Sequence, residues 1–112
     1  LDADPSQIPL AQKLGIQRVE LYTGPYAEHF DPQQPHNGLT DYQETAHAAD
    51  QVGIGVNAGH DLNLDNLPSF VAGIPTLKEV SIGHALITDA LWLGFPETVK
   101  RYLKAVNRAD GL

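Results

Sequence analysis

Two histidines follow glycines where short apolar runs end, and this pattern is the strongest indication of chemistry in the sequence. The segments are Val56-Asn57-Ala58-Gly59-His60 and Ser81-Ile82-Gly83-His84. Glycine lets the backbone turn sharply or approach a ligand closely, and histidine can exchange a proton near neutral pH. His60 is therefore a candidate general acid or base. The alternative is a histidine bonded to a loop carbonyl.

The second segment and an earlier acidic residue extend the candidate site. Gly83-His84 opens a predicted short helix, whose free N–H groups would bind phosphate. The alternative is a tight strand-to-helix turn with a solvent-facing histidine. Glu20 lies within a β-rich run, and a carboxylate on a buried parallel strand must be paired, hydrogen-bonded or protonated. It either faces a site near the end of the strand or is an outward residue held by Arg18 or a helix lysine.

The other histidines and a short acidic segment do not predict a metal site. His29 and His36 lie in a proline-rich loop and His47 lies on a predicted helix, so we expect all three at the surface. The segment Asp61–Asp65 resembles part of a calcium loop, but the glycine and the distal glutamate of an EF-hand are absent. We therefore expect no bound metal.

The amino-acid composition limits which classes of protein this chain can belong to and which partners it can bind. A chain of 112 residues with 42% hydrophobic and 19% charged residues is typical of one globular domain. The net charge of −7 argues against a nucleic-acid partner, but backbone N–H groups can still bind small anions. The chain contains no cysteine for a disulfide, and no apolar run approaches the ~20 residues of a membrane span. We expect a cytoplasmic protein.

Periodicity and capping residues predict alternating helices and strands. Helices are expected over 5–14, 40–52, 66–71, 85–93 and 96–107, and strands over 18–22, 54–57 and 79–82. Asp4 is the predicted N-cap of the first helix, and the proline-rich stretch 25–38 is predicted to be a loop. In the last helix, Val99, Leu103 and Val106 are expected to face inward.

This alternation predicts parallel strands joined by right-handed helical crossovers, either in an open doubly wound sheet or in a (β/α)8 barrel. A short extra helix after the last strand favours the barrel, because barrels commonly bind phosphate there. A complete barrel takes about 250 residues, so the chain would be nearly the second half of one. It starts with Leu1-Asp2, which is typical of the end of a strand, and it contains no Met. We expect a piece of a longer protein.

Three motifs in one order resemble a known enzyme family. They are Glu20-Leu21-Tyr22-Thr23-Gly24, Val56-Asn57-Ala58-Gly59-His60-Asp61-Leu62 and Ile82-Gly83-His84-Ala85. With them the chain is similar to the pyridoxine 5′-phosphate synthases, the ring-closing enzymes of deoxyxylulose-dependent vitamin B6 synthesis. The resemblance implies that residues 1–112 are the C-terminal half of a single TIM (β/α)8 barrel domain. They would run from the end of strand 5 to the C-terminal helix, with the N-terminal half absent.

The resemblance also implies a reaction and roles for individual residues. The family condenses 1-deoxy-D-xylulose 5-phosphate with 3-amino-2-oxopropyl phosphate to pyridoxine 5′-phosphate, phosphate and water, as a transferase-type octamer without a metal or organic cofactor. His60 matches its proton donor, and Glu20 matches a carboxylate that stabilises charged intermediates. Gly83 and His84 match the turn that holds the aminoketone phosphate. Asp61 occupies a substrate-site position that is glycine in some relatives.

Two other functions remain open beside this resemblance. The chain could be a non-catalytic phosphate-binding half-barrel, or part of another phosphate-binding barrel enzyme such as an isomerase or an aldolase. No predicted strand ends in a lysine, which counts against a Schiff-base aldolase. Because the family's other general base, a glutamate, belongs to its N-terminal half, the chain alone is expected to be inactive.

Overall fold

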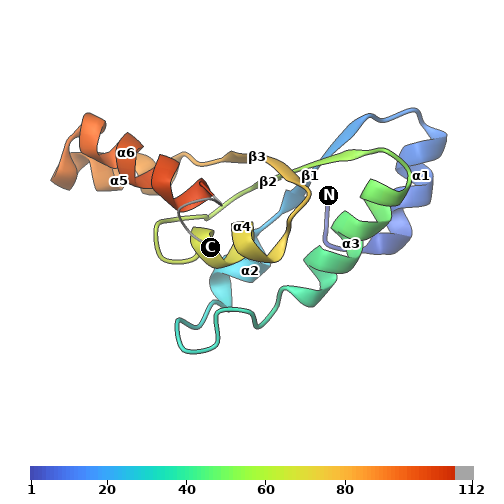
Figure 1. Cartoon of the computed structure of the whole chain (residues 1–112), viewed down its shortest axis with the longest axis horizontal. Helices are drawn as coiled ribbons and strands as arrows, with labels where there is room; N and C mark the ends of the chain where they lie inside the picture. Colours follow the sequence, from blue (N-terminus) through green and yellow to red (C-terminus); the bar gives the residue numbers. More distant parts are fainter. Residues whose placement is uncertain (108–112) are drawn as a thin grey trace.

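The computed structural model describes residues 1–107 as a three-stranded parallel sheet with helices packed beside it (Figure 1). The strands are β1 (Arg18–Tyr22), β2 (Gly55–Gly59) and β3 (Leu77–Ser81). The helices are, in chain order, η1 (Pro5–Gln7), α1 (Ile8–Lys13), α2 (Gly24–Glu28), α3 (Thr40–Gln51), α4 (Leu67–Gly73), α5 (His84–Leu93) and α6 (Phe95–Val106). No helix within the described range is long and apolar enough to cross a membrane.

The sheet confirms the predicted α/β class with parallel strands. Its order is β1-β2-β3, and a helix-containing crossover joins each strand to the next. The register places Tyr22 beside Gly59 and Gly59 beside Ser81. These residues form one row at the C-terminal edge of the sheet, the edge at which parallel α/β proteins bind ligands.

Leu1 lies beside β1 in the manner of a further parallel neighbour. Its N-terminal amino group donates to the carbonyl of Glu20 at 3.0 Å, and its own carbonyl accepts from the N–H of Tyr22 at 2.8 Å. The two hydrogen bonds flank Leu21, which is how one residue of a parallel strand bonds to its neighbour. On the β1 side of the sheet, backbone pairing therefore extends beyond the three strands.

The two faces of the sheet differ in burial because successive strand residues point to opposite sides. One face packs against α3 and α4 around Phe70, which is completely buried, and is formed by Val19, Leu21, Val56 and Ala58. The opposite face is exposed and polar: Arg18 Nη1 and Glu79 Oε1 form an ion pair of 3.0 Å across it. Glu20 lies on this second face, and Arg18 pairs with Glu79 rather than with Glu20.

The N-terminal helix begins as predicted, but the loop prediction for 25–38 is partly wrong. The Asp4 carboxylate caps η1 by accepting from the N–H of Ser6 at 2.9 Å, and this bonding holds the pKa of Asp4 below its ordinary value. The stretch 25–38 starts within α2, because Pro25 suits the first turn of a helix. Tyr26 anchors α2 in the core by donating from its hydroxyl to the carbonyl of Asn66 at 2.6 Å.

The expected inward face of the last helix is wrong for two of its three residues. Val99 is 44% exposed and Leu103 is 62% exposed, whereas Thr98 and Tyr102 are buried. The Tyr102 hydroxyl donates to the Asp89 carboxylate at 2.7 Å and so turns that side of α6 toward α5. The periodicity identified an apolar stripe, but nothing in residues 1–107 covers most of it.

Candidate functional site

All five residues predicted for the site line one cavity at the C-terminal edge of the sheet. The cavity measures about 390 Å³ and is formed by Glu20, Gly59, His60, Asp61, Ser81, Ile82, Gly83 and His84. Residues from the ends of all three strands therefore meet in one place, although they lie far apart in the sequence. Parallel strands bring this about because their C-terminal ends share one edge of the sheet.

Glu20 enters the cavity from β1 and is held by a residue of β3. The Ser81 hydroxyl donates to Glu20 Oε1 at 3.1 Å, across the intervening strand. Gly59 of β2 lies beneath the carboxyl group, since a Cβ built on Gly59 would lie 3.1 Å from Glu20 Cδ. Because Gly59 has no side chain, there is room for the Glu20 carboxylate above β2.

His60 follows β2 in a backbone conformation that side chains rarely adopt. Its φ is 91°, and the next residue, Asp61, has a φ of 60°. Two consecutive non-glycine residues in the left-handed region cost of order 1–3 kcal/mol each, so surrounding contacts must hold them. The Tyr22 ring packs edge to face on the His60 ring, with 5.0 Å between the ring centroids. The His60 side chain is exposed and can meet a ligand.

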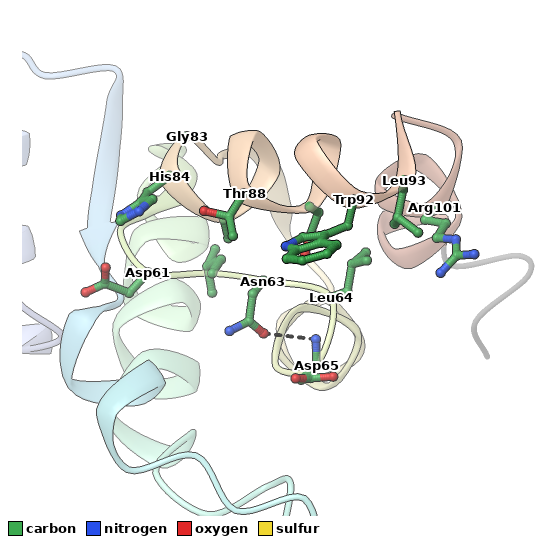
Figure 2. A pocket seen from close by; sticks show the side chains of 13 residues that line it. Asp61, Asn63, Leu64, Asp65, Gly83, His84, Thr88, Trp92, Leu93 and Arg101 are labelled. Atoms are coloured by element: carbon green, nitrogen blue, oxygen red, sulfur yellow. Dashed lines mark hydrogen bonds between the residues drawn. The ribbon is translucent and has the colours of Figure 1, made fainter. Parts of the chain in front are cut away.

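Asp61 continues this turn and is tied to the loop that follows. Its carbonyl accepts from Asn66 Nδ2 at 3.2 Å, and Asn66 is itself buried. The Asp61 side chain is exposed and lines the cavity. Figure 2 shows Asp61 and His84 at one end of a second, adjoining cavity of about 630 Å³, with Arg101 at the other end and Trp92 between the two ends.

Gly83 and His84 form the predicted start of a helix. Gly83 is the N-cap residue of α5 and no side chain caps the helix, so its first N–H groups lack partners within the helix. A Cβ built on Gly83 would meet no atom within 4 Å, so there is open space beside the residue that begins the helix. The hydrogen bond between Tyr102 and Asp89 holds the rest of α5 against α6.

The charges of the site are mainly acidic. Glu20 and Asp61 line the cavity with the two histidines, and no lysine or arginine is among its described lining residues. Within residues 1–107, no three or more histidines and carboxylates gather closely enough to hold a metal ion. His29, His36 and His47 are exposed, as the sequence predicted.

Sequence reasoning missed two residues that hold the site together. Ser81 begins the second Gly-His segment but had no predicted role, although strand alternation places it on the same face as Glu79. Thr23 follows the predicted strand 18–22 and had no predicted role either, yet its side chain is completely buried and bonds to the turn at His60. Both residues are polar and lie at or next to the end of a predicted strand, beside the predicted site. That position was the signal in the sequence that could have identified them.

Comparison of the chain with known proteins shows the family to which it belongs. A family model described as "Pyridoxal phosphate biosynthesis protein PdxJ" matches residues 1–108. The chain belongs to the PdxJ family. The match covers every residue of the cavity, so the resemblance found in the three motifs is confirmed across nearly the whole chain.

Individual PdxJ relatives support the same assignment and carry one name. The chain is 53% identical over 106 residues to "Pyridoxine 5'-phosphate synthase" of Albidiferax ferrireducens, a match that covers 95% of this chain and 42% of the relative. It is 50% identical to the proteins of the same name from Brucella anthropi, over 94% of this chain, and Parabacteroides distasonis, over 93%. Each of these two matches covers 43% of the relative. The chain therefore spans less than half the length of these relatives.

Proposed function

We propose that this chain is part of a pyridoxine 5′-phosphate synthase, which condenses 1-deoxy-D-xylulose 5-phosphate with 3-amino-2-oxopropyl phosphate. The products would be pyridoxine 5′-phosphate, phosphate and water. The observation that carries the proposal is the single cavity that holds Glu20, His60, Asp61, Gly83 and His84. The PdxJ relatives of the same name, about half identical to this chain, support it.

His60 would act as the proton donor. Joining the amine of one substrate to the carbonyl of the other expels water, and closing the ring expels further oxygen leaving groups. Each oxygen that departs as water needs a proton, which a positioned imidazolium can supply. The exposed His60 side chain at the cavity wall, braced by Tyr22, fits this role.

Glu20 would stabilise the positive charge that develops on nitrogen during imine formation. Its carboxylate lies in the same cavity as His60, and Ser81 fixes its position. Fixed charges aimed at a developing charge lower the barrier without reorganising during the reaction. The acidic character of the cavity suits a cationic intermediate better than it suits the phosphate groups.

The phosphate of 3-amino-2-oxopropyl phosphate would bind at the start of α5. Helix N-termini attract anions through free N–H groups and the helix dipole, and the uncapped turn at Gly83-His84 offers both. The Asp61 carboxylate would point away from the phosphate, with any contact made by its backbone. This local arrangement would bind an anion in a chain whose net charge is −7.

The scaffold we propose is a (β/α)8 barrel, of which residues 1–112 form the C-terminal half from the end of strand 5. The pairing of Leu1 with β1 supports a strand before β1. Further barrel elements would cover the apolar side chains exposed on α5 and α6, namely Ile87, Leu91, Trp92, Phe95, Val99 and Leu103. We further propose a homo-octamer, as the resemblance implies, and a cytoplasmic location.

The test is synthesis of pyridoxine 5′-phosphate by the protein expressed from its whole gene. We expect product from the two named substrates, and a loss of turnover of about 10²-fold or more in His60→Ala with an unchanged unfolding midpoint. A His47→Ala variant, which changes an exposed histidine away from the cavity, is the matched control. Wild-type turnover in His60→Ala would overturn the assigned role. Phosphate binding without turnover by the wild type would favour a non-catalytic phosphate-binding protein.

A further inference from the structure

Thr23 makes an unusual set of contacts with the turn that carries His60. Its side chain is completely buried, and its Oγ1 lies 2.6 Å from the carbonyl oxygen of Gly59 and 2.6 Å from that of His60. One hydroxyl proton is therefore shared between two successive carbonyls. The N–H of Thr23 also donates to the carbonyl of Gly59, at 2.9 Å. The residue after β1 thus fastens the end of β2.

These contacts fall where the backbone most needs them. The two carbonyls converge on one hydroxyl because His60 adopts a φ of 91°, and Asp61 follows with a φ of 60°. Such conformations persist only where the surrounding structure fixes them. Without the hydroxyl, the carbonyl of His60 would lose this donor and the turn could relax. The His60 ring, which projects from this backbone, would then shift relative to the cavity.

We propose that Thr23 is a positioning residue that holds the proton donor His60 in place through its backbone. The inference rests on the proposed function, since it concerns how His60 is aimed at the substrate. Thr23 has no exposed surface with which to meet a substrate itself. Tyr22, its neighbour in the chain, contacts the His60 ring directly. Two consecutive residues of one strand end therefore hold the ring and the backbone of His60.

Two other threonines provide matched controls because they are equally buried but remote from the turn. The Thr45 hydroxyl donates to the carbonyl of Asp41 at 2.6 Å, within α3. The Thr98 hydroxyl donates to the carbonyl of Gly94 at 2.7 Å, at the start of α6. Each bonds to one carbonyl four residues earlier, an ordinary use of a helix threonine. Replacing either with valine removes a buried hydroxyl without touching His60.

The experiment compares Thr23→Val, Thr23→Ser and Thr45→Val in the protein expressed from its whole gene. We expect Thr23→Val to lower kcat about 10- to 100-fold, because small misplacements of a reacting group cost that much. Thr23→Ser keeps the hydroxyl and should restore turnover close to the wild-type value, as should Thr45→Val. If Thr23→Val does not fold, Thr23→Cys and Thr45→Cys replace the valine pair, since a thiol is a weak donor. Equal turnover in Thr23→Val and Thr45→Val, or in the two cysteine variants where these replace them, would overturn the proposal.

A second readout does not depend on the reaction. In NMR spectra of the protein labelled with isotopes at histidine, the signals of the His60 ring are identified by their loss in His60→Ala. They should shift in Thr23→Val and stay in place in Thr23→Ser and Thr45→Val. Unmoved His60 signals in Thr23→Val would refute the positioning role. If the wild type does not form pyridoxine 5′-phosphate, the proposed function fails, while these signals still decide whether Thr23 holds His60.

Discussion

A methyl group added at Gly59 should reduce activity while leaving stability almost unchanged. Gly59 lies in β2 directly beneath the Glu20 carboxyl group. A Cβ at this position would lie 3.1 Å from Glu20 Cδ and Oε1 and 3.3 Å from Oε2, closer than the 3.4 Å at which ordinary contact begins. In Gly59→Ala, the carboxylate must therefore move by a few tenths of an ångström. The new methyl group would also occupy part of the cavity.

The effects on stability nearly cancel. Replacing glycine with alanine inside a strand gains roughly 0.5–1 kcal/mol, and forcing the Glu20 side chain off its rotamer costs about 0.5–1.5 kcal/mol. We expect the free energy of unfolding to change by less than about 1 kcal/mol. Activity has no such compensation, because the displaced carboxylate also strains its bond of 3.1 Å from Ser81. If Glu20 has the proposed role, kcat should fall about tenfold or more, which corresponds to 1.4 kcal/mol.

The assay compares Gly59→Ala with Gly55→Ala, using pyridoxine 5′-phosphate formation and urea denaturation. Gly55 lies in the same strand and on the same face, and a Cβ there would lie 3.3 Å from Arg18 Nε. The methyl group of Gly55→Ala would therefore also displace an exposed charged side chain, but that side chain lies outside the cavity. Equal kcat in the two variants would refute the reasoning about Glu20. Unfolding of Gly59→Ala alone would refute the energetics.

Three further predictions concern the scaffold around the site. Phe70→Ala should lower the free energy of unfolding by about 3–5 kcal/mol in urea denaturation, because Phe70 is completely buried against Tyr26 and Tyr42; a loss below about 1 kcal/mol would contradict this. Burial raises the pKa of Tyr26 to about 12. The unfolded chain therefore loses the Tyr26 hydroxyl proton first, near pH 10, and the free energy of unfolding should fall as the pH rises from about 10 to 12. The fall should be less steep in Tyr26→Phe. Equal dependence of the free energy of unfolding on pH in the two proteins would contradict this prediction. Because Asp61 has a φ of 60°, Asp61→Gly should be about 1 kcal/mol more stable than Asp61→Ala, and equal urea midpoints would be the contrary result.

Features set by short stretches of sequence were predictable because their causes are local. Asp4 caps η1 through a residue two positions away, and Gly15 and Gly53 take the positive φ values that end helices. The start of α5 at Gly83-His84 also follows from neighbouring residues. The three motifs together also indicated the family, and the PdxJ match over residues 1–108 confirms that family.

Which residues lie at the strand ends could be predicted from the amino-acid sequence, because glycines, caps and periodicity act over a few positions. The contacts that those residues make depend on the three-dimensional fold. Arg18 and Glu79, like Glu20 and Ser81, are 61 positions apart, and strand register brings them together. The contact of Thr23 with the His60 turn spans 37 positions. Such pairings depend on how parallel strands align across their crossovers, and no local pattern encodes that alignment.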